Sequence, residues 1–365
     1  MTGQQLLPTG TLLKGRYRIV SHLSSGGFGN TYLAADGRQN VKVAIKELFM
    51  STVNQREPDG VTVSVSSSDE DSSIFHSQLE KFKKEYDRLK QIRNAHVVKV
   101  LDCFEENGTA YYAMEFVEGD NLGSRLKQRG KPYVEKTVLS YLKGILNGLG
   151  AIHAAGLLHL DIKPQNIMVD SRRHQVTLID LGASKEYIKG AGATVFTGIA
   201  MTNRYAPPEQ IDGSFEKIGP WTDFYALGAT LYYLLTCHEV PTFTNISEDK
   251  TADKHISLPM PNVSQSTREL VVWMMTLNRM QRPQNVKQIL GRLKQGGEST
   301  PSHPYEEVTV VMNDPGRNNA EGNQREAVKR PNPPKEDEPE FSIVGAIYIV
   351  VIIAIIVCII KYLFF

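Results

Sequence analysis

The sequence predicts an α+β fold of two lobes, with mainly sheet in the N-terminal lobe and mainly helices in the C-terminal lobe. Short segments with alternating apolar residues come first, and segments with apolar residues at helical spacing follow. Beyond position 295 the chain becomes polar and then wholly apolar. This change predicts a disordered tether followed by a single transmembrane helix.

The composition is that of an ordinary globular protein. Charged residues make up 22% and hydrophobic residues 41% of the 365 residues, which excludes fibrous, collagen-like and wholly disordered classes. With 41 Lys+Arg against 40 Asp+Glu the net charge is +1, so we expect no nucleic-acid partner. The cysteines Cys103, Cys237 and Cys358 form no C-x-x-C pair, which favours a reducing compartment and no cysteine zinc site.

The N-terminal lobe is predicted from three alternating segments. Residues Tyr17–Val20, Asn30–Ala34 and Val41–Lys46 are typical of adjacent strands, with a glycine turn between the first two. Residues 1–16 form an N-terminal segment without the features of a secretory signal. The serine- and acid-rich stretch 51–73 predicts a loose surface insertion.

The C-terminal lobe is predicted from helical periodicity. Lys136–Ala155 carries apolar residues at helical spacing, and Phe224–Leu235 and Ser266–Met275 have the same character. The folded unit therefore extends from Leu12 to about Gln295.

Two further segments follow the folded unit. Residues 296–340 are rich in Pro, Asn, Glu and Gly, with few large apolar groups to offset the entropy of ordering. Residues 343–360 form an uncharged run of 18 residues, about 27 Å long as a helix, which matches the apolar thickness of a bilayer. A buried helix or hydrophobic strand is the alternative. Residues 361–365 form a short tail.

The flanking charges predict the orientation of this span. Four basic residues precede the span and one follows it, which favours a folded unit on the cytoplasmic side. The protein would then cross the membrane once, with the lipid bilayer as a partner. A small-xxx-small pair at its start allows a homodimer, with a plain anchor as the alternative. These residues are Arg325, Lys329, Arg330 and Lys335 before the span, Lys361 after it, and the pair Ser342 and Ala346.

A glycine-rich loop runs from Leu23 to Tyr32. Its glycines let the backbone approach phosphates closely, and an aromatic tip can close over a nucleotide. A plain hairpin turn is the alternative. A dinucleotide-binding fold is excluded because a strand-like segment, not a helix, follows the loop. The other common phosphate-binding loop is excluded because the sequence has no GxxxxGK[ST] motif.

Five motifs occur downstream in a fixed order. They are Val43-Ala-Ile-Lys46, Glu85 in FKKEYDRL, His159-Leu-Asp-Ile-Lys-Pro-Gln-Asn166, Asp180-Leu-Gly182 and Ala206-Pro-Pro-Glu209. Together they resemble the protein kinase family, and HLDIKPQN and APPEQ are similar to its bacterial serine/threonine branch. The resemblance covers about Tyr17 to Leu293, so we assign a kinase domain to residues 17–295.

The resemblance implies a bilobal protein kinase fold, with an antiparallel sheet and one helix in the N-terminal lobe and a mainly helical C-terminal lobe. It also implies an activity. We expect a membrane-anchored serine/threonine kinase that transfers the ATP γ-phosphate to protein hydroxyls, including its own, in signalling. ATP is the implied co-substrate and Mg²⁺ the implied metal, with Mn²⁺ as an alternative. The implied location is a bacterial plasma membrane with the kinase domain in the cytoplasm.

The resemblance also implies the catalytic roles. Lys46 would hold the α- and β-phosphates, and Glu85 would pair with Lys46. Asp161 would orient the substrate hydroxyl and accept its proton, while Lys163 would offset charge near the γ-phosphate.

The nucleotide and metal sites follow from the same resemblance. The adenine would lie between Ala44 and Met168, and the hinge at Glu115 and Val117 would bind its edge through backbone groups. Met114 would guard the back of the pocket. The glycine loop would bind ATP through Leu23, Ser24, Ser25, Gly26, Gly27, Phe28, Gly29, Asn30 and Thr31. The metal would be held by Asn166 and Asp180.

Other family positions are expected to be structural. His159 would be packed and hydrogen-bonded, Asp223 would support the catalytic loop, and Glu209 would pair with Arg282. Their sequence contexts are HLD, WTDFYALG, APPEQ and QRP.

Four positions depart from the family pattern. Ser24 replaces the first glycine of the loop, Thr31 a valine, Leu181 a phenylalanine, and Leu160 an arginine that normally binds a phosphate on the activation loop. A nucleotide-binding pseudokinase scaffold is therefore the main alternative. A non-enzymatic membrane adaptor is a third.

Overall fold

The structure, a computed structural model, describes residues 5–27, 29–173, 175–180, 185–186, 204–213, 215–241 and 257–297. The chain divides into two compact units, Met1–Ser302 and His303–Phe365, and every described residue belongs to the first. The predicted span 343–360, the tether beyond residue 297, and Phe28 lie outside the described residues. Within those residues, no helix is long and apolar enough to cross a bilayer.

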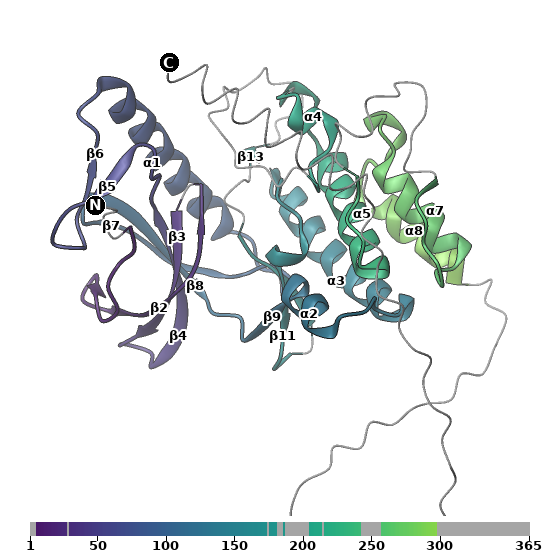
Figure 1. The fold of residues 1–365 in the computed structure, drawn as a ribbon, viewed down its shortest axis with the longest axis horizontal. Helices are drawn as coiled ribbons and strands as arrows, with labels where there is room; N and C mark the ends of the chain where they lie inside the picture. The colour runs from purple at the N-terminus through teal and green to yellow at the C-terminus, as the bar shows by residue number, and fades with distance from the viewer. Residues whose placement is uncertain are drawn as a thin grey trace, which may run out of the picture. The chain divides into compact units, whose positions relative to one another are not determined.

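The N-terminal lobe is built on a six-stranded antiparallel sheet, as the alternating segments predict (Figure 1). A hydrophobic cluster that includes Tyr17, Tyr32 and Val43 lies on the outer face of this sheet. In spatial order its strands are β1 (Leu12–Leu13), β2 (Tyr17–Gly26), β3 (Gly29–Asp36), β4 (Val41–Leu48), β8 (Thr109–Glu115) and β7 (Val100–Glu106).

The stretch 51–73 is ordered, so the prediction of a loose insertion was wrong. It forms an antiparallel hairpin of β5 (Asn54–Arg56) and β6 (Val63–Val65), followed by the start of helix α1 (Asp69–Leu89). Ser68 is the N-cap of this helix, and its side chain accepts a hydrogen bond from the backbone N–H of Asp71. The serine- and acid-rich run is therefore a helix start, where a hydroxyl cap and acidic residues are favourable.

Helix α1 packs on the sheet through one face. Phe75, Phe82, Tyr86 and Leu89 are its buried residues, and their spacing keeps them on one side of a helix. The same helix carries Glu85 toward strand β4.

The C-terminal lobe is mainly helical. The helices expected over 136–155, 224–235 and 266–275 are confirmed as α3 (Glu135–Ala154), α5 (Pro220–Thr236) and α7 (Gln265–Met275). Within the described residues the lobe also has α2 (Leu122–Arg129), α4 (Pro208–Ile211) and α8 (Val286–Gly297), with 3-10 turns η1 (Pro164–Asn166), η2 (Phe215–Lys217) and η4 (Arg279–Gln281).

Short strands complete this lobe and join it to the sheet. A three-stranded sheet has the order β12 (Gln175–Leu178), β11 (Ile167–Asp170), β9 (Gly119–Asn121), and β10 (Leu157–Leu158) pairs with β13 (Lys185–Glu186). The segment after α1 binds β12 directly, because the Val98 N–H donates to Leu178 O and the Leu178 N–H donates to His96 O.

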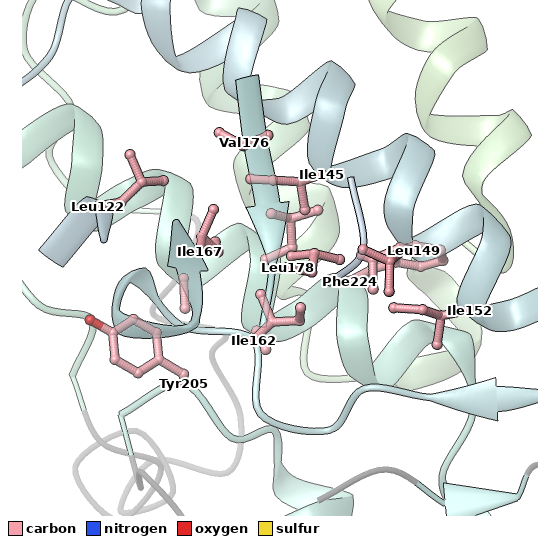
Figure 2. Close-up of a cluster of buried hydrophobic side chains, with 14 of the residues drawn as sticks. Leu122, Ile145, Leu149, Ile152, Ile162, Ile167, Val176, Leu178, Tyr205 and Phe224 are labelled. Carbon is pink, nitrogen blue, oxygen red and sulfur yellow. The ribbon is translucent and has the colours of Figure 1, made fainter. Parts of the chain in front are cut away.

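One hydrophobic cluster spans both lobes. It begins at Ala44 and Leu48 on the inner face of the sheet and continues through α1 into the C-terminal helices. In Figure 2, Ile145, Leu149 and Ile152 of α3 lie close to Val176 and Leu178 of β12 and to Phe224 of α5. Burial of these large apolar side chains is the main stabilising contribution, and it fixes β11 and β12, which flank the candidate site.

Candidate active site

Lys46 on β4 points toward the C-terminal lobe and is paired with Asp180. Its Nζ donates to Asp180 Oδ1 at 2.6 Å. Burial alone would lower the pKa of Lys46, but the charge of Asp180 raises it well above its ordinary value. The charge of Lys46 in turn lowers the pKa of Asp180 to about 2. Both groups are therefore charged at neutral pH.

The predicted ion pair between Lys46 and Glu85 is not formed in this structure. Among the described ion pairs the partner of Lys46 is Asp180, while Glu85 Oε1 accepts a hydrogen bond from the hydroxyl of Tyr112 at 3.2 Å. Tyr112 lies directly opposite Lys46 in the β4–β8 register, and its ring centroid is 4.8 Å from that of Phe82 on α1. The tyrosine therefore contacts the helix at the place where the lysine was expected to bind it.

Burial raises the pKa of Glu85 to about 7, and the charge of Lys46 opposes this rise. Between pH 4.5, the ordinary pKa of the group, and pH 7, the folded protein keeps a proton that the unfolded chain has released. The free energy of unfolding should therefore fall as pH rises through this window, by at most about 1.4 kcal/mol per pH unit from this group.

Glu85→Gln should remove that part of the pH dependence because the amide does not titrate. Denaturant unfolding of both proteins at pH values from 4.5 to 7.5 measures it. A variant with the same pH slope as the parent would contradict this assignment.

The loop of residues 159–166 brings Asp161, Lys163 and Asn166 together. Lys163 Nζ lies 2.8 Å from Asp161 Oδ2, and Asn166 Nδ2 donates to the same oxygen at 2.8 Å and to the Asp161 carbonyl at 2.9 Å. The turn η1 makes this possible, since the Asn166 N–H donates to Lys163 O. Both side-chain contacts use Oδ2, so among the described residues no side chain binds Oδ1, the oxygen that a substrate group would contact.

Asp223 supports the backbone of the loop of residues 159–166, as predicted. Its fully buried carboxylate accepts the backbone N–H groups of His159 at 3.0 Å and Leu160 at 2.7 Å, and Nε2 of His153 at 2.7 Å. Leu160 needs this support because its φ of 62° is unfavourable for a branched side chain. Gln210 Nε2 also donates to Leu160 O. Burial lowers the pKa of His159, consistent with a neutral, packed ring.

The other predicted structural pair is also confirmed. Arg282 binds Glu209 through two nitrogens, at 2.7 and 3.1 Å, and both side chains are almost fully buried. The Thr222 hydroxyl donates to Glu209 Oε1 at 3.0 Å. This pair joins α4 to the segment before α8.

The side chains predicted to line the adenine pocket all belong to, or pack against, the hydrophobic cluster that spans both lobes. Ala44 on β4 is the register partner of Met114 on β8, and both belong with Val117 to the cluster against which Met168 packs. The Glu115 side chain is bound at 2.6 Å by Arg173, so a hinge contact would come from its backbone.

The glycine loop is a continuation of the β2–β3 hairpin. Ser24, Ser25 and Gly26 pair with Thr31, Asn30 and Gly29 in order. A Cβ on Gly29 would lie 1.9 Å from Glu47 O, so only glycine fits where β3 crosses this close to β4. Leu23 is largely exposed.

The model of a protein family described as "Protein kinase domain" matches residues 17–292 of the chain. The chain belongs to the protein kinase family. Serine/threonine-protein kinase B of Synechocystis sp. is 31% identical over 292 residues, covering 77% of this chain and 47% of that protein. Serine/threonine-protein kinase PknL of Mycobacterium tuberculosis is 31% identical over 255 residues, covering 69% of this chain and 57% of that protein.

The fold is that of the family as well. The solved structure "PpkA-294 apo form" superimposes with a TM-score of 0.66 at 25% identity, covering 79% of this chain and 99% of that one. The chain spans about half the length of these two curated relatives.

Asn166 and Asp180 are suitable ligands for the magnesium ion that the family implies. Asn166 uses its amide nitrogen on Asp161, so its amide oxygen remains as a ligand, and Asp180 is anionic with a side chain that is 48% exposed. Magnesium prefers such hard oxygen ligands together with phosphate oxygens and water. Among the described residues, no group of three or more His, Cys, Asp or Glu could hold a metal by itself.

Tyr112 and His153 are site residues that the sequence analysis missed. Tyr112 stands two positions before Met114 on one strand, and residues at this spacing share a face. That periodicity could have identified it. His153 lies in the last turn of α3, one residue after Ile152. No signal in the sequence distinguishes it from a basic residue that only stabilises the C-terminus of its own helix.

Proposed function

We propose that this protein is a serine/threonine kinase that transfers the γ-phosphate of ATP to protein hydroxyls, its own included. The arrangement of Asp161, Lys163 and Asn166 carries the proposal, because it places a fixed carboxylate beside a cation and a metal-ligand amide. Phosphoryl transfer requires positioning and charge compensation more than covalent participation.

In the proposed reaction the substrate hydroxyl oxygen bonds to the γ-phosphorus as the bond to the β,γ-bridging oxygen breaks. Asp161 accepts the hydroxyl proton, and ADP leaves. Lys163 offsets negative charge beside Asp161, and Lys46 is close enough to Asp180 to bind phosphates next to it. Magnesium, held by Asn166 and Asp180, would supply charge neutralisation on the phosphates.

The test is transfer of labelled γ-phosphate from magnesium ATP by the full-length chain, followed by phosphoamino-acid analysis. Label on serine or threonine of the chain or of an added protein supports the proposal. The alternative function is a pseudokinase scaffold, and the observation that supports it is the missing Lys46–Glu85 pair. Such a scaffold would bind ATP without transferring label.

The proposed setting of this activity is a membrane surface. The support is the uncharged run 343–360 and the excess of basic residues before it. We propose a single-pass anchor that keeps the kinase domain on the cytoplasmic side of a bacterial plasma membrane. The chain should sediment with membranes, and a chain lacking 343–360 should not. Crosslinking in membranes tests the proposed homodimer.

Control by activation-loop phosphorylation is not expected. Leu160 is 4% exposed and packs with Leu158 and Ile218, so no guanidinium stands there to bind a phosphate. Replacement of Thr194 and Thr197, which lie outside the described residues, by alanine should leave the transfer rate close to that of the parent. Loss of activity in the alanine variant, restored by aspartate at both positions, would contradict this.

A further inference from the structure

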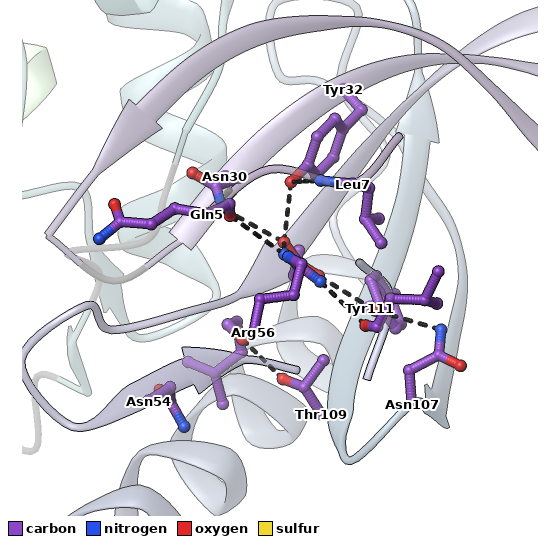
Figure 3. A network of polar contacts seen from close by, with 12 residues as sticks. Gln5, Leu7, Asn30, Tyr32, Asn54, Arg56, Asn107, Thr109 and Tyr111 are labelled. Atoms are coloured by element: carbon purple, nitrogen blue, oxygen red, sulfur yellow. Dashed lines mark hydrogen bonds and ion pairs between the residues drawn. The ribbon is translucent and has the colours of Figure 1, made fainter. Parts of the chain in front are cut away.

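The inserted hairpin β5–β6 is bound to the sheet through a buried carboxylate, Glu47. This residue follows Lys46 on β4, so its side chain points to the opposite face of the strand. It is fully buried. Its Oε2 accepts hydrogen bonds from Arg56 at 2.7 Å, the Tyr32 hydroxyl at 2.9 Å and the Asn30 amide at 3.2 Å, and Oε1 accepts the Tyr111 hydroxyl at 3.0 Å (Figure 3).

Arg56 is the cation of this network and belongs to the hairpin. Its side chain is 1% exposed, and it also donates to Val61 O at 2.9 Å and Gln5 O at 3.2 Å. The guanidinium lies 5.0 Å from the ring centroid of Phe49. Without Arg56, Glu47 would be a buried charge with only neutral donors, which is strongly unfavourable.

The hairpin is itself fixed to the sheet. The Val63 N–H donates to Asn107 O at 2.8 Å, and Gly108 approaches so closely that a Cβ there would lie 2.2 Å from Val63 O. Arg56 is thus presented to Glu47 from a held backbone.

The same carboxylate holds the end of the glycine loop. Asn30 follows Gly29, is 4% exposed, and binds Glu47 through its amide nitrogen while its amide oxygen accepts the Ser25 hydroxyl at 2.7 Å. Gly29 lies against the Glu47 backbone. Both strands of the loop are therefore connected to Glu47, one through Asn30 and the other through Ser25.

We propose that Arg56 and Glu47 are positioning residues for the phosphate-binding loop, with the inserted hairpin as a brace on its outer side. Because the brace already restricts the loop, the loop loses less conformational entropy when a nucleotide binds. The affinity of the loop for the phosphates is therefore higher. The proposal rests on the proposed function for the identity of the ligand.

The experiment compares Arg56→Met with Arg16→Met in the full-length chain. Arg16 forms a similar ion pair with buried Asp36 at 2.6 Å, at the far end of the β2–β3 ladder from the loop. The dissociation constant of magnesium ATP is measured by direct titration, so the result does not depend on turnover. We expect an increase of about 5- to 10-fold for Arg56→Met and no change for Arg16→Met, although both lower the unfolding temperature.

Arg56→Lys keeps the charge and should recover part of the affinity. If Arg56→Met does not fold, Tyr32→Phe removes one hydrogen bond to Glu47 and should weaken ATP binding in the same direction. Equal loss of affinity in the Arg56 and Arg16 variants, or normal affinity in folded Arg56→Met, would overturn the brace. Binding without turnover in every protein would instead reject the proposed function and leave this comparison valid.

Discussion

Replacing Asp161 with asparagine is expected to lower kcat for phosphoryl transfer by about 10²- to 10⁴-fold, the usual contribution of a general base. The amide cannot accept the hydroxyl proton. Its amide oxygen can still accept from the Lys163 ammonium and the Asn166 amide in place of Oδ2, which now accepts from both at 2.8 Å. The amide nitrogen then occupies the Oδ1 position, so the variant lacks a proton acceptor for the substrate hydroxyl.

The measurement is the steady-state rate of label transfer, with the ATP dissociation constant determined in parallel. The variant should bind ATP like the parent, because Asp161 contacts neither the glycine loop nor Ala44 and Met114 in the described structure. Its unfolding temperature should change little, since asparagine has nearly the same shape as aspartate and keeps an oxygen for the Lys163 and Asn166 contacts. A variant that retains a tenth or more of parental kcat would remove Asp161 from the proposed role.

The parts of the site that sequence could predict are those in which spacing fixes geometry. Asp161, Lys163 and Asn166 are five residues apart at most, so one tight turn must bring them together. Helix α3 was predictable because Val138, Leu142, Ile145, Leu149 and Ile152 repeat at helical intervals.

The parts that sequence could not predict depend on choices between partners. Lys46 can reach either of two carboxylates, and burial, Tyr112 and the position of α1 decide between Asp180 and Glu85. No local pattern encodes such a choice. The hairpin within 51–73 was missed for another reason, because its polar residues suggested solvation. In the structure Asn54 is buried and accepts the Met50 N–H, and the Arg56 side chain is buried on Glu47 of the sheet.

The same distinction between buried and exposed polar groups gives the largest expected effect on stability. Arg282→Met should lower the free energy of unfolding by about 3–5 kcal/mol, because it leaves the Glu209 carboxylate buried without its cation. The arginine also donates to the carbonyls of Thr276 at 2.5 Å and Leu277 at 3.0 Å, so its loss leaves backbone acceptors unpaired as well.

Arg172→Ala is the matched control, because the Arg172–Glu118 pair has a similar distance of 2.8 Å but an arginine that is 75% exposed. An exposed pair of this kind contributes about 0–1 kcal/mol. Denaturant unfolding of the parent and both variants measures the difference. The double variant Arg282→Met/Glu209→Leu should be more stable than Arg282→Met alone, since the isolated charge is then gone. If the double variant is no more stable, the loss comes from the backbone carbonyls of the 276–277 segment rather than from the ion pair.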